Sequence, residues 1–119
     1  MVKLISTATL AVAILFSGTA YAGWEKIKTE AEFNTLIVDK HVTYKACDIV
    51  FEKNGEMSGK CGKNNVKGVW QFKNGLVCRQ ATIGNKQYNP DCQLYEVDGN
   101  NVKITRNRGK GEQFVWKIR

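Results

Sequence analysis

This sequence of 119 residues has a single histidine and no closely spaced cysteines. His41 is the only histidine, and no motif places a serine or cysteine to use it as a base. No two cysteines show the Cys-x-x-Cys spacing that presents two thiolates to one zinc ion. The carboxylates Asp39, Asp48, Asp91 and Glu96 are scattered, and no spacing isolates an acid–base pair. These absences argue against an enzyme and against a metal site.

The first 22 residues have the pattern of a cleaved secretory signal. Lys3 supplies the charged region, Leu10 to Phe16 the apolar region, and Ala20 to Ala22 the small-residue cleavage site. The apolar run is shorter than the roughly 20 residues that a membrane-spanning helix needs. We therefore predict one domain, residues 23–119, that is periplasmic or secreted and has no transmembrane segment after cleavage.

The predicted mature chain is basic. It holds 17 Lys and Arg against 11 Asp and Glu, a net charge of +6. A charge of this size is common on a soluble surface, and it also favours anionic partners. Export argues against nucleic acid as the natural partner, and we expect a monomer.

One helix is expected, over about residues 29–39. Thr29 and Glu32 have the spacing of a capping box, in which each side chain bonds a free backbone N–H of the first turn. Phe33, Leu36 and Ile37 then share one face. That face should lie over a sheet or plug the end of a barrel.

From His41 onward, apolar residues alternate with polar ones and turn signals recur every ten to twenty residues. This pattern indicates a mainly all-β fold of about eight antiparallel strands in a meander. An up-and-down, lipocalin-like small barrel removes the free edges that an open sheet would leave. A β-sandwich is the alternative.

Four cysteines in a small exported chain predict two disulfides. A three-residue loop with Gly55 in the left-handed conformation sets Glu52 opposite Glu56 and Cys47 opposite Cys61. This register favours a Cys47–Cys61 bond.

The turn at Lys73 to Gly75 repeats the letters of the first turn, and the same arithmetic sets Trp70 opposite Cys78. A loop centred on Asn85 sets Ile83 opposite Gln87 and Cys78 opposite Cys92. We therefore favour Cys47–Cys61 with Cys78–Cys92, while the two other connectivities stay open.

Two sets of residues are candidates for function. An eight-stranded barrel is packed solid or holds a small apolar ligand, and four aromatic residues could line the pocket or form the core. They are Trp70, Phe72, Phe114 and Trp116. The second set, for anionic partners, is basic and lies mainly in the glycine-flanked loop after the next-to-last strand. It comprises Arg79, Arg106, Arg108 and Lys110.

Four short patterns resemble a group of small exported bacterial proteins of unknown function. They are Gly68-x-Trp70, Gly75-Leu76-Val77-Cys78-Arg79, Pro90-Asp91-Cys92-Gln93 and Gly109-x-Gly111. Some proteins of this kind are labelled dihydrodipicolinate reductase. That activity needs a dinucleotide-binding βαβ unit and a second domain, which a 97-residue β meander does not supply. The segment Gly109 to Phe114 lacks the third glycine of a dinucleotide loop.

The expected function is therefore binding without catalysis and without a cofactor. The ligand would be a small apolar molecule in the barrel, or an anionic envelope component or protein on the basic loop. The alternative is a secreted inhibitor of an envelope or extracellular hydrolase, because a disulfide-bonded barrel can present rigid loops to an enzyme. An enzyme is the least favoured class.

Overall fold

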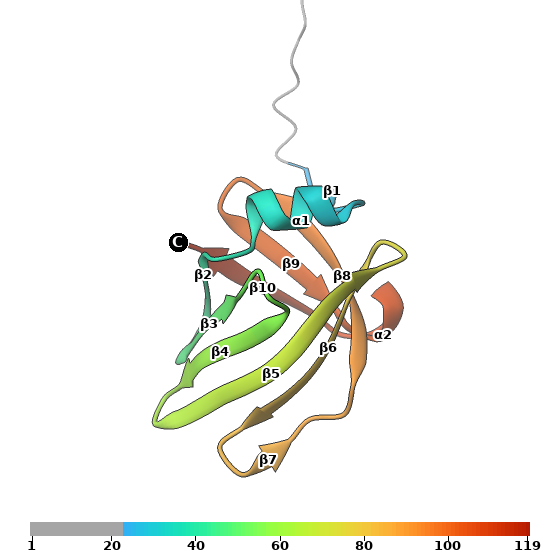
Figure 1. Cartoon of the computed structure of the whole chain (residues 1–119). Coiled ribbons are helices and arrows are strands. Elements are labelled where there is room, and N and C mark those ends of the chain that lie inside the picture. Colours follow the sequence, from blue (N-terminus) through green and yellow to red (C-terminus); the bar gives the residue numbers. More distant parts are fainter. Residues whose placement is uncertain (1–22) are drawn as a thin grey trace, which may run out of the picture.

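The computed structural model describes residues 23–119, so the predicted signal lies outside the described residues. The chain forms a closed barrel of eight antiparallel strands (Figure 1). The barrel strands are β2 (His41–Tyr44), β3 (Cys47–Phe51), β4 (Glu56–Cys61), β5 (Asn64–Lys73), β6 (Leu76–Ile83), β8 (Asp91–Asp98), β9 (Asn101–Thr105) and β10 (Gln113–Ile118). Lys117 of β10 pairs with Thr43 of β2 and closes the circle. The prediction of a mainly all-β meander closed into a barrel is confirmed.

Four short elements complete the fold. They are β1 (Glu25–Lys26), α1 (Glu30–Leu36), β7 (Lys86–Gln87) and α2 (Arg106–Gly109). β1 extends the sheet beside β8, and β7 pairs with the end of β6. Within residues 23–119, no helix has the length and apolar content needed to cross a membrane.

Helix α1 begins as expected but is shorter than the predicted range 29–39. Thr29 Oγ1 accepts a hydrogen bond from the Glu32 amide at 3.1 Å, and Glu32 Oε1 accepts one from the Lys28 amide at 3.3 Å. The helix ends at Leu36 because Asp39 adopts a left-handed backbone with φ of 63° and turns the chain into β2.

Helix α1 lies across one end of the barrel (Figure 1), and Phe33 and the C-cap residue Ile37 are buried in the core. Phe33 is fully buried, and its ring packs against four others at centroid distances of 5.0 to 5.9 Å. Those rings belong to Phe51, Trp70, Phe72 and Tyr95. Of the two placements that the sequence pattern allowed, over a sheet or at the end of a barrel, the helix takes the second.

The first hairpin has the predicted register. Cys47 lies opposite Cys61, and the two form a disulfide. The Glu52 amide donates to the Glu56 carbonyl at 2.8 Å, so these two residues face each other across the turn as expected.

The second hairpin differs from the prediction by one residue. Asn74 and Gly75 both have positive φ, 52° and 77°, which makes a two-residue turn in place of a three-residue one. Trp70 consequently lies opposite Arg79, not Cys78. The prediction that Trp70 lies opposite Cys78 is wrong.

The third turn is also one residue tighter than expected, since Ile83 pairs with Lys86 and not with Gln87. The Cys78–Cys92 disulfide forms nevertheless, because the ladder is interrupted over residues 88–90 before β8 begins. That interruption contains Pro90, which has no backbone N–H to donate. The interruption adds one unpaired residue to the strand, which compensates for the shorter turn and sets Cys78 opposite Cys92 as predicted.

Candidate functional site

The barrel is hollow in the half away from α1. A pocket of about 280 Å³ lies there, between the rings that pack on Phe33 and the opposite end of the barrel. Phe51 and Tyr95 contact Phe33 and also line the pocket, so they form its floor. Tyr44 and Cys47, at the adjoining ends of β2 and β3, line it near the opening.

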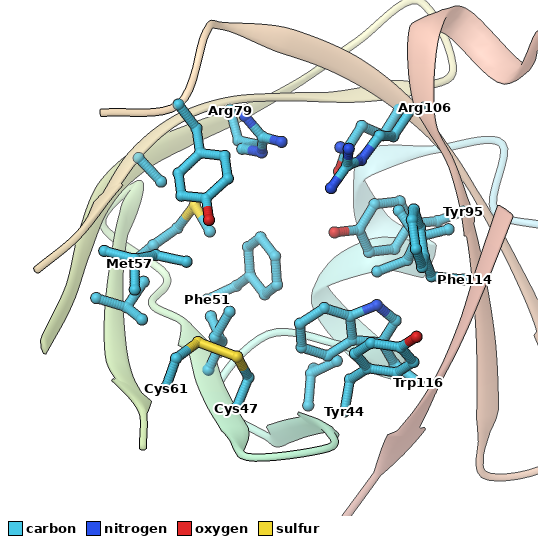
Figure 2. Close-up of a pocket in the computed structure, with 18 residues that line it drawn as sticks. Tyr44, Cys47, Phe51, Met57, Cys61, Arg79, Tyr95, Arg106, Phe114 and Trp116 are labelled. Carbon is cyan, nitrogen blue, oxygen red and sulfur yellow. A yellow bond between two sulfur atoms is a disulfide. The ribbon is translucent and has the colours of Figure 1, made fainter. Parts of the chain in front are cut away.

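Most of the pocket wall is apolar (Figure 2). Tyr44 stacks on Trp116 with ring centroids 5.1 Å apart and meets Phe114 edge-on at 5.9 Å. Met57 and the Cys47–Cys61 disulfide add sulfur surface on another side. This lining suits a hydrocarbon or aromatic group, since burying apolar surface there removes it from water.

Two arginines interrupt the apolar wall. Arg79 comes from the middle of β6, and Arg106 is the first residue of α2. Figure 2 shows both guanidinium groups on the same side of the pocket, pointing towards one another. Each is held in place: Arg79 Nη1 donates to the Asn89 carbonyl at 2.9 Å, and Arg106 lies 4.8 Å from the Phe114 ring centroid.

The charge of this arginine pair is not balanced inside the pocket. No aspartate or glutamate lines it, and neither arginine has a carboxylate oxygen within 4.0 Å in the described part of the chain. Burial raises the pKa of the Tyr95 hydroxyl above its ordinary value, and the positive charge of Arg79 only partly opposes this rise. Tyr95 is therefore neutral at pH 7 and contributes no negative charge.

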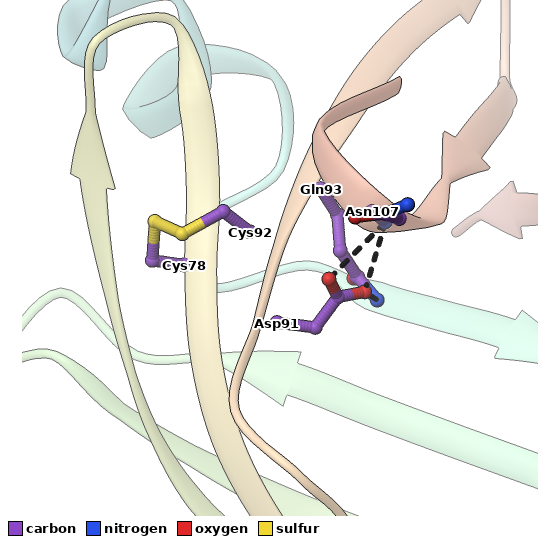
Figure 3. The surroundings of a disulfide bond; sticks show 5 residues. All are labelled: Cys78, Asp91, Cys92, Gln93 and Asn107. Atoms are coloured by element: carbon purple, nitrogen blue, oxygen red, sulfur yellow. Dashed lines mark hydrogen bonds between the residues drawn. A yellow bond between two sulfur atoms is a disulfide. The ribbon is translucent and has the colours of Figure 1, made fainter. Parts of the chain in front are cut away.

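Asp91 on β8 pairs with Arg79 on β6, but its side chain forms no salt bridge with that arginine. Its carboxylate accepts hydrogen bonds from the Asn107 amide at 3.1 Å and from Gln93 Nε2 at 3.0 Å (Figure 3). These bonds attach α2 to the start of β8. They also fix the helix from which Arg106 extends.

The predicted basic set is divided by the fold. Arg79 and Arg106 line the pocket, whereas Arg108 and Lys110 are exposed. The expected basic loop is a compact turn in which Asn107 and Arg108 have left-handed backbones and the Gly111 amide bonds to the Arg106 carbonyl at 2.8 Å.

The predicted aromatic set is divided as well. Phe114 and Trp116 line the pocket. Trp70 and Phe72 pack under α1, where Trp70 Nε1 donates to the Glu52 carbonyl at 2.8 Å.

Sequence reasoning missed Tyr44, Phe51, Met57 and Tyr95 as pocket residues. Strand alternation could have indicated Tyr95, because it shares a face with Gln93 and Val97 on β8. The choice between core and pocket depends on where α1 packs, which strand periodicity does not specify.

The single histidine of the sequence lies away from the pocket. His41 Nδ1 lies 2.8 Å from Asp48 Oδ1 on the exposed outer face. Within residues 23–119, no group of three or more His, Cys, Asp or Glu side chains is arranged to hold a metal ion.

Comparison of the chain with models of protein families, with curated proteins and with solved structures gave no match. The resemblance to small exported bacterial proteins stays a prediction, and a functional assignment depends on the pocket itself.

Proposed function

We propose that this protein binds a small, mainly apolar ligand inside its barrel and does not transform it. The observation that carries the proposal is the pocket of about 280 Å³ whose floor and walls are largely aromatic and aliphatic. A cavity of ~150 Å³ accommodates benzene, so this pocket has room for about eleven or twelve non-hydrogen atoms. A ligand of that size fits within the barrel without moving α1.

Export of the protein is part of this proposal. The signal pattern of residues 1–22 and the two disulfides support it, because disulfides persist in oxidising compartments. Expression of the full chain in a bacterium tests it. Mass spectrometry should find a chain that begins at Gly23 in the periplasm or medium, and an uncleaved chain in the cytoplasm would contradict export.

Calorimetric titration with uncharged linear alcohols from hexanol to dodecanol tests binding. Each added methylene group should raise the affinity about fourfold, since its burial contributes ~0.8 kcal/mol. The rise should stop once the chain fills the pocket. Absence of heat with every alcohol would overturn the proposal.

A pair of neighbouring substitutions on β6 locates the site. Ile83 lines the pocket, whereas Thr82 has the opposite orientation and its hydroxyl donates to the Lys67 carbonyl. Ile83→Trp should fill the cavity and abolish binding of decanol. Thr82→Trp, which adds the same indole outside, should leave the affinity unchanged.

A further inference from the structure

We infer that the ligand carries a carboxylate, which the guanidinium groups of Arg79 and Arg106 bind inside the barrel. The inference rests on the proposed function, because it assigns the head group of a ligand whose apolar part occupies the same pocket. It makes the natural ligand an amphiphilic acid of about eight to ten carbons, or an aromatic acid of similar size.

The first argument is the positive charge inside the pocket. Two cationic side chains line a mainly apolar pocket that contains no acidic residue. Asp91 keeps its negative charge, but it lies beside the two arginines in a neighbouring surface pocket and does not line this one. Tyr95 stays protonated. An anion is the ligand chemistry that balances this charge, and a partly buried ion pair with arginine is stronger than one on the surface.

The second argument is preorganisation. Arg79 spends one of its five N–H donors on the Asn89 carbonyl, and Arg106 is held against Phe114. The two guanidinium groups face one another at the same side of the cavity, and they come from two different elements (Figure 2). A planar carboxylate can accept from both groups, and little side-chain entropy is lost on binding because both arginines are already held.

The third argument is the size of the pocket. A phosphate ester would use about five of the eleven or twelve non-hydrogen atoms that fit, and a carboxylate uses three. The smaller head group leaves room for a chain that reaches Phe51 and Met57.

The exposed charges around the open end of the barrel also favour an anionic ligand. Because α1 leads into β2, the β2–β3, β4–β5 and β6–β7 connections lie at the opposite, open end (Figure 1). Each connection has an exposed lysine in it or beside it: Lys45, Lys63 and Lys86. At the closed end, exposed Glu30 and Glu32 on α1 are accompanied by exposed Lys53 and Lys73 in the β3–β4 and β5–β6 turns, so the charge there is mixed. This asymmetry would steer an anion towards the opening.

The test compares decanoate, decanol, decyl phosphate and decyltrimethylammonium by calorimetric titration at pH 7.5 and low salt. Decanoate should bind at least tenfold more tightly than decanol, and the ammonium compound more weakly than either. If decanol and decanoate bind equally, the head-group assignment is wrong while the pocket remains a binding site. If decyl phosphate binds more tightly than decanoate, the carboxylate assignment is wrong.

Variants then locate the head group. Arg79→Gln and Arg106→Gln should each lower the affinity for decanoate at least tenfold and leave the affinity for decanol unchanged, which also shows that each variant folds. Arg108→Gln is the matched control, because Arg108 belongs to the same turn as Arg106 but is exposed outside the pocket. An equal loss in all three variants would overturn the inference, since it would place the anion on the surface.

Discussion

Arg79 and Asp91 lie directly opposite each other on β6 and β8, yet their side chains form no salt bridge. The Asp91 carboxylate bonds instead to the backbone of Asn107, and the Arg79 guanidinium bonds to the Asn89 carbonyl. One residue thus anchors α2, and the other keeps most of its donors for the interior of the barrel.

Replacing Asp91 should therefore act through α2. We expect Asp91→Ala to lower the free energy of unfolding by about 1.5 to 3 kcal/mol, because it removes a carboxylate that accepts bonds from Asn107 and Gln93. Urea denaturation measures the change. Asp98→Ala, at the other end of β8, is the control and should cost less than about 0.5 kcal/mol. Equal losses would mean that the bond to Asn107 contributes nothing.

Tyr95 should make stability fall at alkaline pH. Burial raises the pKa of its hydroxyl above the ordinary value of 10.0, so between these two values the unfolded chain loses the proton and the native protein keeps it. The free energy of unfolding then decreases as pH rises above about 10, by up to ~1.4 kcal/mol per pH unit. Below pH 10 Tyr95 adds no pH dependence.

Urea midpoints at pH 9, 10 and 11 measure this contribution. Tyr95→Phe should flatten the decrease above pH 10, whereas Tyr88→Phe should retain it. A Tyr95→Phe variant with the same alkaline slope as the wild type would show that burial of this hydroxyl does not control the slope.

The two disulfides should differ in their effect on binding but not in their effect on stability. Both join residues 14 apart in sequence, so each should contribute about 3 kcal/mol through the entropy of the unfolded chain. Cys47 and Cys61 line the pocket. Cys78 alternates with inward-facing Arg79 on β6, and Cys92 alternates with inward-facing Gln93 on β8, so the second disulfide lies outside.

Changing each pair to alanine separates the two roles. Removal of either pair should lower the urea midpoint to a similar extent. Only removal of the inner pair should also change the affinity for decanol. The assignment of inner and outer bonds fails if the outer pair has the larger effect on binding.

Phe33 should be the most sensitive position of α1. Its ring is fully buried against four aromatic rings, so Phe33→Ala should cost about 3 to 5 kcal/mol. Leu36→Ala, at a half-buried position of the same helix, should cost less. Chemical denaturation with tryptophan fluorescence compares the two, and equal costs would contradict the view that Phe33 is the plug.

The turns show how far local sequence specifies this fold. Lys53-Asn54-Gly55 and Lys73-Asn74-Gly75 share their letters, but only the second is a two-residue turn with both residues left-handed. In the first, the Trp70 amide donates to the Gly55 carbonyl and Trp70 Nε1 donates to Glu52. These bonds come from a strand fifteen residues away, so the triplet alone could not distinguish the two turns.

Part of the pocket could be predicted from strand alternation, and the rest depends on long-range contacts. Alternation with buried Val77 places Arg79 inside the barrel, and alternation with buried Ile104 does the same for Arg106. Sequence reasoning selected both arginines, but as surface residues. Their meeting across the cavity depends on barrel closure and on the Asp91 bond that fixes α2, and both are long-range contacts.

The pairing of β2 with β10 has a consequence for how the barrel is assembled. Every other pairing between barrel strands joins consecutive barrel strands, whereas this one joins segments about 75 residues apart. Its closure entropy is the largest of any strand pair, so we expect it to form last during folding. Until it forms, β2 and β10 present unpaired backbone edges, and a second copy could exchange its last strand there.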